Sequence, residues 1–341
     1  MTSAPTLIDA LPVAGLGFWP TPLHRLDRLS AEFGTEIWIK RDDVQGVALA
    51  GNKLRKFDVV LGRALAAGAD TLVTTGAIQS NSARTGAAAA AAVGMRCVLV
   101  LSGEAPATPT GNLVLDHIVG ADVRFAGSAS WAELNATVDA VVADLARRGR
   151  RAVAAPVGCS SPLGTLGFAR AFLELDAQCQ AVGLTPSAVV HTSTSGGTHA
   201  GLLVGRAAAG RDVRVIGIDA GDLYSDRTGA LATLAEAAAA EVGMALTVDP
   251  ASIELVTSQL GAGYGQPTAA AAAAIGRLAR TEAIVTDPVY SGKGLAGLFE
   301  LIETGAVTGP VVFWHTGGYH AVFDPRHGEP LLDALGADNG P

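Results

Sequence analysis

Lys53 is the residue of this sequence best placed to do covalent chemistry. It stands in the string AGNKLRK (50–56), just inside a predicted helix start at which Asn52 is the expected N-cap. A helix N-terminus disfavours an ammonium group, so we expect a lysine there to have a lowered pKa, which suits Schiff-base formation. Taken alone, the string also fits the solvated face of an ordinary Lys/Arg-rich helix.

The loop TSTSGGTHAG (192–201) is the best candidate for an anion site. It follows an apolar run and precedes an Ala-rich helix, and the candidate ligands within it are Ser195, Gly196, Gly197 and Thr198. Glycine lets the backbone approach a ligand closely, and helix N-termini bind anions. The loop contains neither GxGxxG nor a Walker lysine, which favours a single small phosphate over a nucleotide. An ordinary strand-to-helix turn is the alternative.

Other polar loops follow predicted strands in the same way. The string GAIQSNSAR contains Gln79, Ser80, Asn81 and Ser82, of which Asn81 is a candidate both for capping a helix and for binding a ligand. DPVYSGKG (287–294) and HTGG (315–318) are further candidates, and Tyr264 in GAGYGQP either lines a site or packs in a turn. In open α/β sheets, ligands bind at the carboxyl ends of strands, so we expect these loops to converge.

The elements that must position these loops alternate along the chain. Continuous apolar runs are separated by stretches of helical length, and these runs include 71–75, 97–101, 152–157, 188–193, 213–218, 283–287 and 311–315. Such a pattern is typical of parallel sheets covered on both faces, so the predicted class is α/β, doubly wound. The Ala runs at 86–92, 236–240 and 269–274 are interpreted as ordered helices, because Ala is the best helix former.

Composition narrows the function classes. The formal net charge is −8 over 341 residues, and the short run of arginines at 147–151 suits a helix end, so nucleic acid is a poor candidate partner. The chain lacks an apolar run of the roughly 20 residues that a membrane span needs, and no basic segment precedes the apolar N-terminus. We therefore expect a cytoplasmic protein without membrane contact. Three scattered cysteines predict neither disulfides nor a metal site.

The strings above, taken in order, resemble the fold-type II pyridoxal-phosphate enzymes, the tryptophan-synthase-β-like superfamily. Within it they are similar to the branch that holds D-cysteine desulfhydrase and 1-aminocyclopropane-1-carboxylate (ACC) deaminase. The resemblance runs from WIKRDDVQG (38–46) and AGNKLRK through TTGAIQSNSAR, PVGCSSPLGTLGF, TSTSGGTHAGL and GYGQPT to DPVYSGK and FWHTGG, which is nearly the whole chain.

The resemblance implies roles for individual residues. Lys53 forms the Schiff base with pyridoxal 5′-phosphate and moves the Cα proton, while Asn52 and Asn81 contact the cofactor, Asn81 at its 3′-oxygen. The 195–198 loop holds the phosphate. Ser80 binds the substrate carboxylate or assists proton transfer, and Tyr264 and Tyr290 flank the substrate and help with protonation. The other substrate contacts expected are Gln79, Asn81, Ser82, Cys159, Ser160 and His320.

Ser291 and Thr316 favour the desulfhydrase side of this branch. Deaminases of the branch carry an acid at the position of Ser291, where it protonates the pyridine nitrogen, and Leu at the position of Thr316. A hydroxyl leaves that nitrogen largely neutral and the ring a weaker electron sink. Ring opening of ACC requires strong electron withdrawal, whereas loss of a thiolate does not, so ACC deaminase is disfavoured.

Three departures from the desulfhydrase pattern bear on the substrate rather than the cofactor. Ser82 stands where His is usual, Cys159 replaces the second glycine of a GG-S loop, and Tyr319-His320 follows HTGG where smaller or Pro-containing pairs are typical. His320 is a candidate acid, base or substrate contact, or alternatively a hydrogen-bonded structural histidine.

The sequence therefore predicts two α/β domains of fold type II, a small one at 54–165 and a large cofactor-binding one formed by 1–53 and 166–341. The predicted reaction is β-elimination on a small β-substituted amino acid, with D-cysteine giving pyruvate, ammonia and hydrogen sulfide as the best candidate. The alternatives are a β-replacement synthase, in which a nucleophile captures the aminoacrylate, ACC deaminase, and a non-catalytic relative that binds the cofactor or an amino acid. The family resemblance suggests a homodimer.

Overall fold

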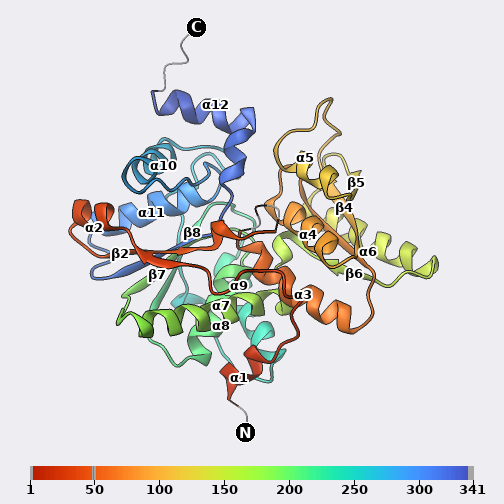
Figure 1. Cartoon of the computed structure of the whole chain (residues 1–341), viewed down its shortest axis with the longest axis horizontal. Helices are drawn as coiled ribbons and strands as arrows, with labels where there is room; N and C mark the ends of the chain where they lie inside the picture. Colours follow the sequence, from red (N-terminus) through yellow and green to blue (C-terminus); the bar gives the residue numbers. More distant parts are fainter. Residues whose placement is uncertain (1–2, 48, 50, 337–341) are drawn as a thin grey trace.

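A computed structural model describes residues 3–47, 49 and 51–336, and it contains two sheets (Figure 1). Ala50, the first residue of the AGNKLRK string, and both ends of the chain lie outside this part. The larger sheet has the strand order β1-β2-β10-β7-β8-β9, and it is parallel except for β1, which pairs antiparallel with β2. Its strands are β1 (Leu23–Arg25), β2 (Ile37–Arg41), β7 (Ala188–Ser193), β8 (Arg214–Asp219), β9 (Glu254–Val256) and β10 (Val311–His315).

The smaller sheet is entirely parallel, with the order β5-β4-β3-β6. Its strands are β3 (Thr71–Ala77), β4 (Arg96–Ser102), β5 (Asp122–Phe125) and β6 (Ala152–Ala155). All four fall inside the predicted small domain 54–165, and every strand of the larger sheet falls outside it. The predicted α/β class with mainly parallel sheets is confirmed, while the boundary residues themselves stay a prediction.

Helices cover both sheets, as the class requires. In chain order they are α1 (Ala4–Asp9), α2 (Asp27–Phe33), α3 (Lys53–Ala66), α4 (Asn81–Ala92), α5 (Gly111–Ile118), α6 (Trp131–Arg147), α7 (Pro162–Ala181), α8 (Gly197–Ala208), α9 (Arg227–Ala240), α10 (Ala269–Glu282), α11 (Ser291–Glu303) and α12 (Pro325–Ala334). The three Ala runs lie in α4, α9 and α10, which confirms them as helical. Among the residues that the structure describes, none of these helices is long and apolar enough to cross a membrane.

The large sheet is buried on both faces because its strands are apolar at successive positions. Val190 and Phe313 pack with α2, α10 and α11 on one face, whereas Val189 and Val312 pack with α7 and α8 on the other. Side chains of a strand point alternately to the two faces of the sheet. A strand that is buried on both faces is therefore apolar at successive positions and not at every second one. The small sheet repeats this arrangement between α3 and α4 on one face and α6 on the other.

One predicted strand is wrong. The run 283–287 is irregular in the structure: α10 ends at Glu282, and Ala283 takes the left-handed conformation with φ 54°. The Val285 carbonyl accepts a hydrogen bond from His315 Nε2 at 3.0 Å in place of a strand partner. Since β10 already pairs with β2 and β7, the run has no free sheet edge beside it.

Helix α3 is held by a buried ionic network centred on Arg55. Its guanidinium makes two bonds of 2.8 Å to the Asp42 carboxylate and contacts both carboxylate oxygens of Glu174 on α7, at 2.9 and 3.0 Å. Burial raises the pKa of Glu174, but Arg55 and Lys40 outweigh it and lower that pKa to about 2. The network joins α3 to α7 and to the turn after β2.

We expect Arg55→Met to lower the free energy of unfolding by about 3–5 kcal/mol, because removing one partner leaves buried carboxylates without their counter-charge. Urea unfolding followed by circular dichroism measures this. Arg63→Met is the matched control on the same helix, since the Arg63–Glu241 pair is exposed and should contribute less than about 1 kcal/mol. Equal losses in the two variants would contradict the role given to Arg55.

A buried histidine pair makes stability depend on pH. His191 on β7 has no exposed surface and its Nε2 lies 3.1 Å from His199 Nδ1. Burial lowers the pKa of His191 from 6.5 to about 4. The unfolded chain therefore binds a proton at a pH where the folded chain does not, so stability is complete above pH 6.5 and is lost as the pH falls toward 4.

We expect His191 to account for roughly 3 kcal/mol of acid destabilisation across that window. His191→Gln should flatten the slope of unfolding free energy against pH between 6.5 and 5, even where it lowers stability as a whole. His117→Gln, on the exposed end of α5, should keep the slope of the native protein. An unchanged slope in His191→Gln would mean that other groups take up the protons.

Candidate active site

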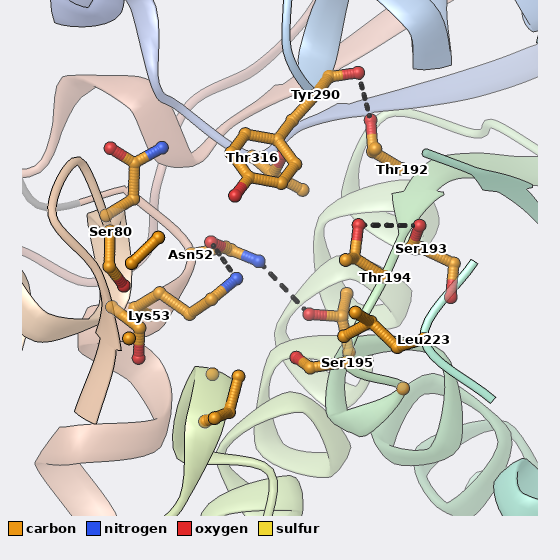
Figure 2. Close-up of a pocket in the computed structure, with 18 of the residues that line it drawn as sticks. Asn52, Lys53, Ser80, Thr192, Ser193, Thr194, Ser195, Leu223, Tyr290 and Thr316 are labelled. Carbon is orange, nitrogen blue, oxygen red and sulfur yellow. Dashed lines mark hydrogen bonds between the residues drawn. The ribbon is translucent and has the colours of Figure 1, made fainter. Parts of the chain in front are cut away.

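A pocket opens where the carboxyl ends of strands from both sheets meet (Figure 2). The space within it, including the part open to solvent, is about 760 Å³. Many of the residues predicted from sequence line it: Asn52, Lys53, Ser80, Asn81, Ser82, Ser195, Gly196, Thr198, Tyr264, Tyr290 and Thr316. The described lining does not include the other predicted residues, which are Gln79, Cys159, Ser160, Gly197, Ser291 and His320.

Lys53 is the first residue of α3, and Figure 2 shows its amine directed into the pocket. The amine donates to Asn52 Oδ1 at 3.1 Å, and Asn52 Nδ2 donates to Thr198 Oγ1 at 3.1 Å. Burial, with the nearby charge of Arg84 acting in the same direction, lowers the pKa of Lys53 to about 8. Asn52 occupies the predicted N-cap position, but its side chain does not cap the helix; it connects the lysine to the anion loop instead.

The anion loop joins β7 to α8, with Gly196 at φ 84° as the residue before the helix. A Cβ at Gly197 would lie 2.7 Å from both Lys56 Nζ and Ser160 Oγ, so only glycine fits there. The Ser160 hydroxyl lies 2.9 Å from that of Ser195 and accepts from the Gly197 N–H at 3.2 Å. Gly197 and Ser160 thus form the floor of a cradle that suits a small anion at the helix N-terminus.

Lys56 belongs to this cradle, although the sequence reasoning missed it. Its side chain has no exposed surface, and Nζ donates to Gly158 O and Ser160 Oγ, both at 3.1 Å. Burial and the charge of Lys53 hold its pKa well below the ordinary lysine value. The spacing of the two lysines in NKLRK was an available signal, because residues three apart share one helix face.

The start of α4 supplies a second polar wall. Ser80 is its N-cap, since its hydroxyl accepts from the Ala83 N–H at 3.1 Å, so the prediction of Asn81 as the cap is wrong. Asn81 Oδ1 accepts from Asn112 Nδ2 at 2.9 Å; Asn112 must be the donor, because its Nδ2 also bonds the Gln79 carbonyl. This orientation leaves the Asn81 amide N–H groups as donors for the pocket.

Gln79 and His320 support this wall from behind. Gln79 bonds the backbone at Thr110 and Asn112, at 2.9 and 2.8 Å. His320 Nε2 lies 2.8 Å from Asn81 Oδ1 and 3.1 Å from Arg84 Nη2. Burial, followed by the charge of Arg84, lowers the pKa of His320 to about 3, so the ring is neutral. The geometry agrees with the hydrogen-bonded structural histidine among the alternatives for this residue.

Ser82 and Cys159 differ in their access to the pocket. Ser82 is buried and lines it, and its hydroxyl has no hydrogen-bond partner within the described part of the chain. Cys159 is fully buried with φ 51°, and burial raises the pKa of its thiol to about 12. A neutral, enclosed thiol below the lining does not offer the substrate contact predicted for it.

Tyr264 and Tyr290 meet at the wall of the pocket. Their hydroxyl oxygens are 2.5 Å apart, and burial raises the pKa of each, that of Tyr290 well above the ordinary value. Trp131, the first residue of α6, meets the Tyr264 ring edge-on with centroids 6.5 Å apart and completes this aromatic wall. Sequence reasoning missed Trp131, because a single aromatic at a helix start carries no pattern of its own.

The Ser291 hydroxyl is hydrogen-bonded to Asp287. Its hydroxyl donates to the Asp287 carboxylate and accepts from the Asp287 N–H, while Asp287 also accepts from the N–H groups of Val289 and Tyr290. A contact between Ser291 and a pyridine nitrogen requires this hydroxyl to leave Asp287, and it stays a prediction. The Thr316 hydroxyl does line the pocket, beside the backbone carbonyl that holds the Asn52 N–H at 2.9 Å.

Together these residues fit a phosphorylated aldehyde. A buried amine of lowered pKa can form a Schiff base, and the glycine-lined cradle with Lys56 beside it can hold a phosphate. The Asn81 amide and the hydroxyls of Ser80 and Thr316 can hydrogen-bond the polar groups of a ring between these two points. The individual ligand assignments remain predictions, but the donor set is that of a pyridoxal-phosphate site.

The chain is similar to known proteins over nearly its whole length. Residues 15–317 match the family described as pyridoxal-phosphate dependent enzyme. A protein of Pyrococcus horikoshii provisionally named 1-aminocyclopropane-1-carboxylate deaminase is 36% identical over 329 residues, covering 96% of this chain and 98% of the relative. A Salmonella schwarzengrund protein named D-cysteine desulfhydrase is 39% identical over 312 residues, covering 89% of this chain and 93% of the relative.

The solved structures agree. The crystal structure of an ACC deaminase homologue superposes with a TM-score of 0.90 at 35% identity, covering 98% of this chain and all of that one. An O-ureido-L-serine synthase, 19% identical with a TM-score of 0.67 and covering 98% of this chain and 96% of its own, shares the fold. The chain therefore belongs to the family of pyridoxal-phosphate-dependent enzymes and is a lyase that uses this cofactor.

Proposed function

We propose that this enzyme catalyses β-elimination on a small β-substituted amino acid, with D-cysteine as the best candidate substrate. D-Cysteine and water would give pyruvate, ammonia and hydrogen sulfide. The observation that carries the proposal is the meeting, in one pocket, of a lysine with a pKa of about 8 and a pair of neutral tyrosine hydroxyls. A 39% identical relative named D-cysteine desulfhydrase supports this substrate.

Lys53 is the proposed base for the Cα proton. The bound cofactor withdraws electrons from Cα and so makes this proton removable. An amine whose pKa lies near working pH both accepts and returns a proton readily, and the Lys53 amine has been brought into this range by burial. Ser80 is the proposed contact for the substrate carboxylate, because it lines the pocket at the start of α4.

Tyr264 and Tyr290 are the proposed proton donors on the opposite side. Their raised pKa values keep both hydroxyls protonated at neutral pH, so the pair can donate a proton but does not compete with Lys53 as a base. The proton shared between the two oxygens can be passed to a leaving thiolate. The two sides of the pocket would thus divide the acid and base roles.

The hydroxyl lining near Thr316 supports elimination over the ring opening suggested by the relative named as an ACC deaminase. Thr316 presents a hydroxyl to the pocket, while the carboxylate of Asp287 is already bonded by the N–H groups of 289–291 and by Ser291. A hydroxyl leaves a pyridine nitrogen largely neutral, which suffices when the leaving group is a thiolate.

A β-replacement is the second candidate, and Ser82 favours it. Its buried hydroxyl lines the pocket without a partner in the described chain, so it can hydrogen-bond an incoming nucleophile or a second substrate. The other residues named above serve both reactions. Only an analysis of the products can therefore distinguish β-elimination from β-replacement.

We further propose that the enzyme is a homodimer and is located in the cytoplasm. Phe18 is 74% exposed, and Val13 in the N-terminal segment and Val44 after β2 are exposed as well. An exposed apolar surface of this kind suits an interface with a second copy of the chain.

Lys53→Ala should abolish turnover and the visible absorbance of the lysine-bound cofactor, because no other amine lines the pocket in the described chain. Spectra of the purified variant and a pyruvate assay measure both. Arg63→Ala, on the exposed face of the same helix, should keep spectrum and rate. Turnover by Lys53→Ala at more than about a thousandth of the native rate would contradict the assignment.

With D-cysteine as substrate, sulfide and pyruvate should appear in equal amounts, and L-cysteine should react more slowly. Repeating the assay with an added thiol separates the candidates, because β-replacement releases sulfide while pyruvate falls behind. Equal amounts at every thiol concentration would support elimination. A shortfall of pyruvate would favour the synthase, and the absence of sulfide from both isomers would exclude cysteine as the substrate.

A further inference from the structure

Lys293 is a buried cation outside the lining of the pocket. It is the third residue of α11 and its side chain has no exposed surface. Its amine donates to two backbone carbonyls, Leu260 O at 2.8 Å and Gly263 O at 3.3 Å. No carboxylate of the described residues is within hydrogen-bond distance of it. An ammonium group in the first turn of a helix is disfavoured both by burial and by the helix dipole.

The carbonyls that Lys293 holds belong to the segment 257–268, which joins β9 to α10 and carries Tyr264. Gly261, Gly263 and Gly265 all have positive φ, of 65°, 135° and 74°. Glycine has the widest backbone freedom of any residue, so the segment cannot hold one shape through local preference. Its internal backbone bonds are few, Leu260 N to Thr257 O and Gln266 N to Gly263 O.

Helix α11, by contrast, has a rigid start. Asp287 accepts from the N–H groups of Val289, Tyr290 and Ser291, at 2.9, 2.7 and 3.0 Å. A Cβ at Gly294 would lie 2.2 Å from Thr192 Oγ1, so the helix packs directly against the end of β7. Lys293 therefore connects a soft, glycine-rich segment to a fixed platform.

We infer that Lys293 is a positioning residue, which holds the 257–268 segment so that Tyr264 stays in hydrogen-bond contact with Tyr290 at the wall of the pocket. Both bonds lie just before Tyr264 in the chain, and Gly263 is its neighbour in sequence. Burial lowers the pKa of Lys293, while the charges of Asp219 and Asp287 act in the opposite direction and help to keep it charged. The catalytic consequence rests on the proposed function; the structural one does not.

The test compares Lys293→Met with the native enzyme, both loaded with cofactor. Hydrogen exchange followed by mass spectrometry should show faster exchange of the 258–266 amides in the variant, and kcat for D-cysteine should fall by roughly 100-fold, the cost of misplacing a group by about 1 Å. Leu298→Ala is the matched control, because it removes buried volume from the same helix away from this segment.

Lys293→Gln keeps a donor for one of the two carbonyls, so its 258–266 amides should exchange at a rate between those of the native enzyme and Lys293→Met. If Lys293→Met does not fold, Lys293→Gln is compared with the native enzyme in its place. In a Tyr264→Phe background, Lys293→Met should cost much less than 100-fold, because most of the effect passes through that hydroxyl.

The inference is overturned if the 258–266 amides of Lys293→Met exchange no faster than those of the native enzyme. It is also overturned if Leu298→Ala speeds their exchange as much as Lys293→Met does. An additive loss in the double variant would also overturn it. If the native enzyme releases no sulfide from D-cysteine, the proposed substrate fails, and the exchange comparison still decides the role of Lys293.

Discussion

The bonding of Arg55 to Asp42 and Glu174 is the constraint on which the site depends. Arg55 lies on α3 two residues after Lys53, while its partners come from the loop after β2 and from α7. Trp314 of β10 donates to the same Asp42 carboxylate at 2.9 Å. Because these bonds fix the helix in both position and rotation, they also fix the direction in which Lys53 enters the pocket. A buried ion pair contributes little net stability, but a displaced partner is costly, so the arrangement is specific.

The pocket is built around buried positive charge. Lys56 and Arg84 have no exposed surface and Lys53 is partly buried, and each has a lowered pKa for which burial is the main cause. In such a group each positive charge disfavours protonation of the others, and a bound anion offsets this repulsion. This explains how one environment can both prepare an amine for Schiff-base chemistry and hold a phosphate.

The two lobes contribute different functions to the pocket. Of the two lobes (Figure 1), the one with the small sheet supplies Ser80, Asn81 and Trp131, and the larger one supplies the tyrosine pair. The anion cradle is shared, because Ser160 follows β6 of the small sheet while Ser195 and Gly197 follow β7 of the large one. The proposed proton donors therefore lie in the larger lobe, whereas Ser80, which is proposed for the substrate carboxylate, lies in the smaller one. Two of the three departures from the desulfhydrase pattern, Ser82 and His320, lie on or against the polar wall at the start of α4, away from the cradle residues.

The sequence by itself determined the fold class, because this follows from the local pattern of apolar runs separated by helices. The cofactor family and the role of Lys53 followed from the order of the motifs, through their resemblance to a known family. The sequence did not determine which residues reach the pocket. Lys56, Trp131 and Lys293 act through partners far away in the chain, and the orientation of Asn81 depends on Asn112. Likewise, Ser291 is adjacent to the site in sequence but is bonded to Asp287. The choice among hydrogen-bond partners is made only when the elements pack, since each side chain has several partners of similar energy.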